Sequence, residues 1–170
     1  MDDDMDHRIV SALRACGGDP RVAGAARALS WAGEHGAVWL AAGLAGAALD
    51  APRRGAWLRG TALTAGAHLT SIGVKRVVRR PRPAHVRPLV RTAGRHSFPS
   101  SHATSAAAAA VAFGALHRLG ARTAWPVAAA VCLSRLVAGV HYPSDVAAGA
   151  ALGALTARLG ADWMRGGVRG

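Results

Sequence analysis

Five apolar segments, each close to the length of a membrane-spanning helix, constrain the fold of this chain more than any other feature of its sequence. They lie at roughly 31–51, 56–78, 103–119, 123–140 and 144–163. A helix that crosses a bilayer needs about 20 predominantly apolar residues, and the segments approach that length although their charge-free centres are shorter. We therefore predict an all-α, integral membrane helical bundle with about five spanning helices.

A soluble helical bundle is the alternative, because much of the apolar character is alanine and the mean hydropathy is only +0.19. Three features favour the membrane. Trp57, Trp125 and Trp163 lie at segment ends on one predicted face, as an interfacial aromatic belt does. Small residues recur over 149–153 at a spacing that suits close helix packing. The first apolar segment lacks the polar face of a soluble surface helix.

The N-terminal region is too charged to span a bilayer, and its acidic start lacks the basic and apolar runs of a signal peptide. Its pattern predicts two short helices, the first capped by Asp6 and ended by glycines 17–18, and the second begun by Asp19 and Pro20. We expect their apolar faces to lie in the membrane interface. The predicted division is 1–30 for these interfacial helices, 31–163 for the membrane-embedded domain and 164–170 for a basic tail.

The net charge of +12, from 21 Lys and Arg against 9 Asp and Glu, requires an anionic partner such as nucleic acid, acidic lipid or a phosphorylated substrate. Much of this charge lies in 79–99, where four prolines exclude a continuous helix and predict a semi-rigid basic loop. Phe98 is the one aromatic residue of that loop, and no base-stacking pattern accompanies it. We therefore expect no nucleic-acid partner and favour lipid headgroups or solvent.

The second apolar segment carries a stripe of polar residues at offsets of four, three and four, namely Thr64, His68, Ser71 and Lys75. These offsets place the stripe on one side of a helix. In a bilayer such a stripe must face the bundle interior or a wet cavity, because lipid offers polar groups no partner. We interpret His68 as a hydrogen-bonded packing histidine and Lys75 as a candidate functional residue.

Two helix starts supply further candidate residues. Ser100 and Ser101 precede a run of helix-forming residues, so backbone N–H groups there form an anion site, and His102 lies in its first turn. At the last boundary, Arg135 is followed by His141, Pro143 and Asp145. Pro143 suits the first helical position, so Asp145 can reach back to the imidazole and fix its tautomer. A purely structural capping role for Asp145 is the alternative at this point.

Together the clusters read Lys75-x6-Arg82-Pro83, Pro99-Ser100-Ser101-His102 and Ser134-Arg135-x5-His141-x3-Asp145. This pattern resembles the three-part signature of the type 2 phosphatidic acid phosphatase (PAP2) family, which is related to vanadium haloperoxidases and bacterial acid phosphatases. The one departure is Ser101, where the family more often has glycine. The resemblance covers roughly residues 56–163, and the short chain also looks like small polyprenyl-phosphate enzymes of the decaprenylphosphoryl-phosphoribose phosphatase type.

The resemblance implies a phosphatase that hydrolyses a phosphomonoester or diphosphate on a polyprenyl-type lipid or glycerolipid. It implies that His141 attacks phosphorus to form a phosphohistidine, that Asp145 orients His141, and that His102 protonates the leaving oxygen. The phosphate-binding positions that it implies are Lys75, Arg82, Ser100, Ser101 and Arg135.

The implied phosphate-binding cations are Lys75, Arg82 and Arg135. Together with a helix N-terminus, such cations can stabilise a transferring phosphoryl group in place of a metal, and we call this set the charge clamp. The sequence has no cluster of carboxylates to hold divalent ions, so we expect no metal and no cofactor. The expected partners are a membrane lipid phosphate and the bilayer, and the expected location is the cell membrane with several spans. The alternative function is a membrane-tethered protein that binds acidic lipid or nucleic acid without catalysis.

Overall fold

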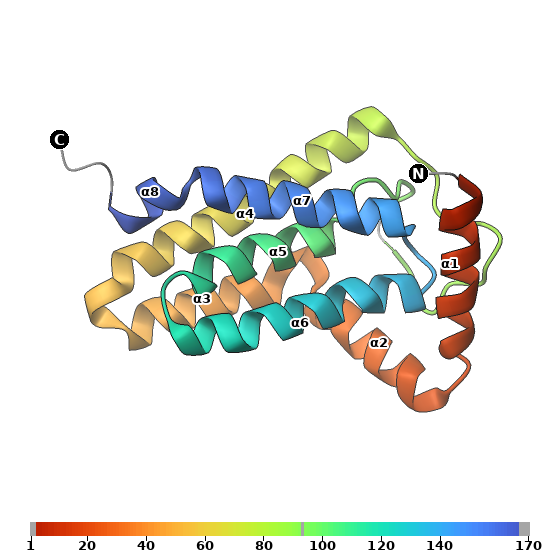
Figure 1. The fold of residues 1–170 in the computed structure, drawn as a ribbon, viewed down its shortest axis with the longest axis horizontal. Helices are drawn as coiled ribbons and strands as arrows, with labels where there is room; N and C mark the ends of the chain where they lie inside the picture. The colour runs from red at the N-terminus through yellow and green to blue at the C-terminus, as the bar shows by residue number, and fades with distance from the viewer. Residues whose placement is uncertain (1–2, 93, 167–170) are drawn as a thin grey trace.

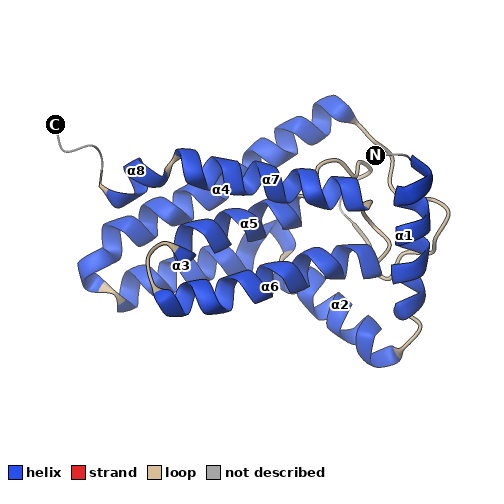
Figure 2. Cartoon of the chain, in the orientation of Figure 1, coloured by secondary structure: helices blue, strands red, loops and turns tan. Residues whose placement is uncertain are grey.

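The structure is a computed structural model that describes residues 3–92 and 94–166 as a bundle of helices (Figures 1 and 2). The helices in chain order are α1 (Asp3–Cys16), α2 (Pro20–Ala32), the 3-10 turn η1 (Glu34–Gly36), α3 (Ala37–Leu49), the 3-10 turn η2 (Ala51–Arg53), α4 (Arg54–Val78), α5 (Ser101–Gly114), α6 (Arg118–Val137), α7 (Pro143–Leu159) and α8 (Ala161–Arg165). Within the described residues the only β pairing is an isolated bridge between Pro81 and His96. The predicted all-α fold is therefore confirmed.

Helix α5 is the centre of the bundle, in contact with α4, α6 and α7. Its alanines are almost completely buried, and their small side chains let the neighbouring helices approach closely. The predicted small-residue packing is confirmed on α7. A Cβ added to Gly149 would lie 2.5 Å from the carbonyl oxygen of Ser100, and one added to Gly153 would lie 2.0 Å from that of Thr104.

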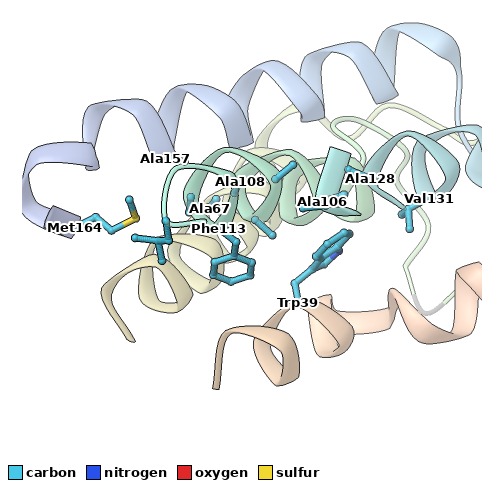
Figure 3. Close-up of a cluster of buried hydrophobic side chains, with 14 residues drawn as sticks. Trp39, Ala67, Ala106, Ala108, Phe113, Ala128, Val131, Ala157 and Met164 are labelled. Atoms are coloured by element: carbon cyan, nitrogen blue, oxygen red, sulfur yellow. The ribbon is translucent and has the colours of Figure 1, made fainter. Parts of the chain in front are cut away.

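Larger side chains fill the remaining core between the alanine-lined helices. Trp39 from α3, Phe113 from α5 and Met164 from α8 are each at most 5% exposed and belong to one cluster (Figure 3). The ring of Phe113 lies 5.2 Å from that of Trp57, centroid to centroid. The predicted basic tail 164–170 includes Met164, but this residue lies buried in α8, and residues 167–170 lie outside the described residues.

Helices α3 to α7 correspond to the five apolar segments. The first segment differs in detail, because α2 continues to Ala32 and α3 begins only at Ala37. Between them His35 and Gly36 have φ values of 53° and 73°, in the left-handed region that interrupts a helix. Among the residues that the structure describes, none of the helices has both the length and the apolar character needed to cross a bilayer.

The two N-terminal helices pack against one end of the bundle, where α1 lies across it (Figure 1). The start of α2 is as predicted, with the Asp19 carboxylate accepting hydrogen bonds from the N–H groups of Arg21 and Val22. The predicted capping role of Asp6 is wrong. Helix α1 begins at Asp3, so Asp6 lies inside it and its carboxylate turns inward, where it is 1% exposed.

The same end of the bundle holds the basic loop 79–99 and the starts of α5 and α7. The Arg14 side chain of α1 donates to the carbonyl oxygen of Arg87 in this loop at 2.6 Å. At the opposite end, Arg53 donates to the carbonyl of Leu116 and Arg59 to that of Met164, at 2.7 and 3.0 Å. The loops therefore separate into two groups, and all candidate residues lie in or beside the first.

Candidate active site

A cavity of about 670 Å³ opens at the end of the bundle that carries the basic loop. Its walls come from α2, η1, α4, α5, α6 and the loops that follow α4 and α6. Six of the eight predicted site residues line it, and these are Lys75, Arg82, Ser101, His102, Arg135 and His141. Residues separated by up to 66 positions in the sequence thus meet at one positively charged site.

His141 and Asp145 form a buried pair at the start of α7. Pro143 is the first residue of the helix, as predicted, and Asp145 the third. The Asp145 Oδ2 atom accepts the backbone N–H of Tyr142 at 2.8 Å and lies 3.6 Å from Nδ1 of His141. Because Nδ1 faces the carboxylate, Nε2 is the ring nitrogen that remains available on the cavity side. It lies 3.3 Å from an Nη atom of Arg82.

The electrostatic surroundings keep the His141 imidazole neutral. Burial lowers its pKa, and the positive charges of Arg82, Arg135 and Lys75 lower it further, while Asp145 opposes them, so that the pKa is about 3. Burial also lowers the pKa of Arg82, an effect that Asp145 partly offsets. A neutral imidazole has a free electron pair on one nitrogen, which is the form that a nucleophile requires.

Arg82 is held rigidly by the backbone. Its Nη1 atom donates to the carbonyl of Val140 at 2.7 Å and its Nε atom to that of Gly94 at 2.9 Å. These bonds tie the basic loop to the segment that carries His141. They fix the guanidinium beside the His141 ring.

Arg135 has a different environment. Its side chain comes from the last turn of α6 and is 3% exposed, yet its Nε and Nη1 atoms find no hydrogen-bond partner within the described part of the chain. An uncompensated buried guanidinium is costly. The arrangement is typical of a site prepared for an anion that completes it.

Lys75 lines the cavity and also anchors the basic loop. Its Nζ donates to the carbonyl oxygens of His96, Ser97 and Pro99, at 3.3, 3.2 and 2.8 Å. These three acceptors match the three hydrogens of an ammonium group. In this arrangement Lys75 contributes positive charge to the cavity, with its hydrogens directed to the backbone.

The start of α5 places Ser101 and His102 in the cavity wall but not Ser100. Ser100 is completely buried, caps α5, and donates its backbone N–H to the carbonyl of Asp145 at 2.9 Å. The hydroxyl of Ser101 accepts a hydrogen bond from Ser71 at 2.8 Å. Sequence analysis assigned Ser100 to the phosphate, whereas here its observed contacts join α5 to α7.

The N-terminal half of the cavity wall was not predicted. Arg27, Ser30 and Trp31 from α2 and Glu34 and His35 from η1 all line the cavity, although the sequence pattern indicates interfacial helices for residues 1–30 and a spanning segment for 31–51. Nothing in the residue types signals this, because the helices are simply amphipathic. The polar stripe on α4 does face inward as predicted. His68 makes the predicted hydrogen bond, to the Ser105 hydroxyl at 2.8 Å, but it also lines the cavity.

Comparison with protein families matches residues 55–168 to the PAP2 superfamily. The chain belongs to this superfamily. The resemblance found in the three motifs is thus confirmed, and so is the prediction that the chain is an enzyme of the phosphatase class. The matched region begins after α3, so α1 and α2 lie outside it.

Similar proteins carry more specific names. A decaprenylphosphoryl-5-phosphoribose phosphatase from Mycolicibacterium smegmatis is 45% identical over 147 residues, which cover 83% of this chain and 78% of that protein. One from Mycobacterium tuberculosis is 44% identical over 137 residues, covering 79% and 76%. The crystal structure of a transmembrane PAP2-type phosphatidylglycerolphosphate phosphatase from Bacillus subtilis superposes with a TM-score of 0.80 at 22% identity, covering 98% of this chain and 87% of that one. This last likeness confirms the fold.

Proposed function

We propose that this PAP2 phosphatase hydrolyses a phosphomonoester on a membrane lipid, with a polyprenyl-linked phosphosugar as its first candidate substrate, through a phosphohistidine intermediate. The substrate class is supported by the names of relatives that are 44–45% identical to this chain. The observation that carries the chemistry is the geometry at His141. Its Nδ1 faces the Asp145 carboxylate and its Nε2 lies beside Arg82 in a cavity that Arg135 also lines.

In the first step Nε2 of His141 attacks phosphorus as the bond from phosphorus to the alcohol oxygen breaks. The positive charge that develops on the ring is stabilised by Asp145. Arg82, Arg135, Lys75 and the backbone N–H of Ser101 stabilise the negative charge on the three equatorial oxygens. His102 begins this step with hydrogens on both ring nitrogens and gives one of them to the departing alcohol oxygen, which leaves the imidazole neutral.

In the second step water attacks the phosphorus of the phosphohistidine, and the phosphorus–nitrogen bond breaks to release inorganic phosphate and neutral His141. His102, now deprotonated, accepts a proton from that water. The His102 Nε2 atom lies 3.0 Å from the backbone carbonyl of Ser30. A carbonyl only accepts, so Nε2 carries a hydrogen and Nδ1 is the nitrogen that exchanges the catalytic proton.

We also propose that the bundle lies in the cell membrane, with α3–α7 surrounded by lipid and α1 and α2 at the interface. Large apolar side chains on the outside of these helices support this placement, among them Leu49 at 88%, Leu69 at 66% and Leu133 at 55% exposed. Extensive exposed apolar surface is typical of a membrane or protein contact. The superposition with a transmembrane PAP2 phosphatase agrees with it.

Purified protein in detergent should release inorganic phosphate from polyprenyl-linked phosphosugars or other lipid phosphates. His141→Ala should lower turnover by about four orders of magnitude or more, since nucleophile and charge clamp act as a unit. Activity should persist in excess EDTA and be inhibited by vanadate, which mimics the five-coordinate transition state. Binding of acidic lipid without phosphate release, or a strict requirement for added magnesium, would refute the proposal.

The separate roles of His102 and His141 can be tested by comparing substrates whose leaving groups differ in their need for a proton. His102→Ala should reduce turnover of a lipid phosphate much more than that of p-nitrophenyl phosphate, because a good leaving group needs little protonation. His141→Ala should reduce both equally. Equal losses for His102→Ala on both substrates would remove the general-acid assignment.

The membrane placement can be tested by thiol labelling. Cys16 is exposed at the end of the bundle that carries the active site. In oriented vesicles an impermeant thiol reagent should label Cys16 from the same side as a cysteine introduced at Thr92. A cysteine introduced at Arg54, at the other end, should be labelled from the opposite side. Labelling of all three from one side would show that the bundle does not cross the bilayer.

A further inference from the structure

A charge triplet of Asp6, Arg80 and Asp145 connects the N-terminal helix to the candidate nucleophile. The Arg80 Nη2 atom lies 3.0 Å from Oδ2 of Asp6, and its Nη1 atom lies 3.1 Å from Oδ1 of Asp145. One guanidinium therefore bridges two carboxylates that lie 139 positions apart in the sequence. The carboxylates are 1% and 0% exposed, so that water does not screen the arrangement.

The triplet is built into the start of α7. The backbone N–H of Ser144 donates to Oδ1 of Asp6 at 3.2 Å, and the Ser144 hydroxyl donates to Oδ2 of the same carboxylate. The Ser144 hydroxyl in turn accepts from Nη1 of Arg80 at 2.6 Å. Arg80 also stacks over the Tyr142 ring, 4.2 Å from its centroid. Asp6 thus caps the helix whose third residue is Asp145.

We propose that Asp6 and Arg80 are positioning residues for the phosphatase reaction, which together hold the Asp145 carboxylate against His141 and keep the charge behind the nucleophile negative. This inference rests on the proposed role of His141. Arg80 alone would neutralise Asp145 and draw it away from the imidazole. Asp6 restores a net charge of −1 to the triplet, so the positive charge that develops on His141 during attack remains stabilised.

Neither Asp6 nor Arg80 lines the cavity. Their effect on the reaction must therefore pass through Asp145 and His141 and not through contact with the substrate. Asp6 also lies outside the matched family region, which begins at residue 55. Helix α1 therefore contributes to the site from outside the matched family region.

The experiment compares Asp6→Asn with Asp4→Asn, an exposed carboxylate on the same helix. The asparagine side chain can still accept the Ser144 N–H, so the substitution removes the charge and keeps the cap. We expect kcat to fall about 10- to 100-fold in Asp6→Asn, by analogy with the range found when groups that orient a metal-ligating histidine are removed. KM and the thermal stabilisation by inorganic phosphate should stay close to those of Asp4→Asn, which should match wild type.

Arg80→Gln, with Arg79→Gln as its exposed neighbour control, tests the same connection should Asp6→Asn fail to fold, because Arg80 is the partly exposed member of the triplet, with a side chain that is 22% exposed. Since the two residues act through one carboxylate, the double variant should be no slower than the slower single variant. The inference would be overturned if the double variant lost kcat by the product of the two single losses. It would also be overturned if kcat of Asp6→Asn lay within twofold of that of Asp4→Asn. An active His141→Ala variant would instead overturn the proposed function itself.

Discussion

The Nε2 atom of His102 lies 3.0 Å from the backbone carbonyl oxygen of Ser30, in the last turn of α2. A helix that precedes the matched family region thus holds the candidate general acid. The imidazole also lies close to the end of the same helix, because a Cβ added to Gly33 would lie 2.9 Å from Cδ2 of His102. The end of α2 therefore sets the position of this imidazole.

Gly33→Ala should displace His102 and lower the turnover of a lipid phosphate about 10- to 100-fold, because a displacement of about 1 Å is that costly in a positioned site. Gly33 has a φ of −83°, which alanine adopts without strain, so the effect comes from the new methyl group. Gly24→Ala is the matched control, since a Cβ there meets nothing within 4 Å. Equal turnover of the two variants would mean that His102 moves aside without consequence.

The sequence predicts those parts of the site that depend on local signals. Pro143 and Asp145 mark the start of α7, and Ser100 marks that of α5, because helix starts follow from residue types a few positions apart. The stripe ending at Lys75 faces the bundle interior, and two of its residues, His68 and Lys75, line the cavity, because the period of a helix is fixed. These features needed no knowledge of distant contacts.

The parts that the sequence does not predict depend on distant or backbone contacts. The partners of Asp6 are Arg80 and Ser144, 74 and 138 positions away, and an aspartate near a helix start is equally typical of a cap. The Ser30 carbonyl that holds His102 has no signature, since every residue has such an acceptor. The break between α2 and α3, in contrast, has a local signal in Gly33 and Gly36 that the apolar pattern outweighed.

Replacement of Arg135 should separate stability from binding. Arg135→Met removes a buried guanidinium with two unpartnered nitrogens, so without ligand the thermal midpoint should rise by at least about 2 °C, which corresponds to about 1 kcal/mol in a chain of this size. The stabilisation of wild type by inorganic phosphate should be lost in the variant. Arg158→Met, at an exposed position, should leave both measurements unchanged. A lower midpoint for Arg135→Met would contradict the reading of Arg135 as an anion site.

The low pKa of His141, about 3, predicts that its imidazole stays neutral in acid solution. Among the rings of ¹⁵N-labelled histidine, the signal that is missing in His141→Gln should belong to a ring that remains neutral down to about pH 5. A midpoint near the ordinary value of about 6.5 would contradict the buried, neutral nucleophile.

The lowered pKa of His141 also makes the free energy of unfolding depend on pH. In the unfolded chain His141 binds a proton near pH 6.5, whereas in the folded chain it does so only near 3. Between these values the unfolded state binds more protons, so the free energy of unfolding should decrease as the pH falls from about 6.5 toward 3. His141→Gln lacks this contribution, and its thermal midpoint should fall less than that of wild type between about pH 7 and pH 5. Parallel decreases would show that His141 is not the source.

The close contact between α5 and α7 predicts that Gly153→Ala destabilises the protein strongly. Its Cβ would lie 2.0 Å from the Thr104 carbonyl oxygen, a backbone atom that cannot move without separating the helices. Overpacking of this kind costs about 1–3 kcal/mol or more. Because α5 carries His102 and α7 carries Asp145, turnover should fall together with the thermal midpoint.

Gly66→Ala is the matched control, for its Cβ meets nothing within 4 Å and both substitutions gain the same helix propensity. Its midpoint should equal or exceed that of wild type, so the difference between the two variants measures the clash alone. Equal midpoints would mean that α5 and α7 are not held at the separation described here.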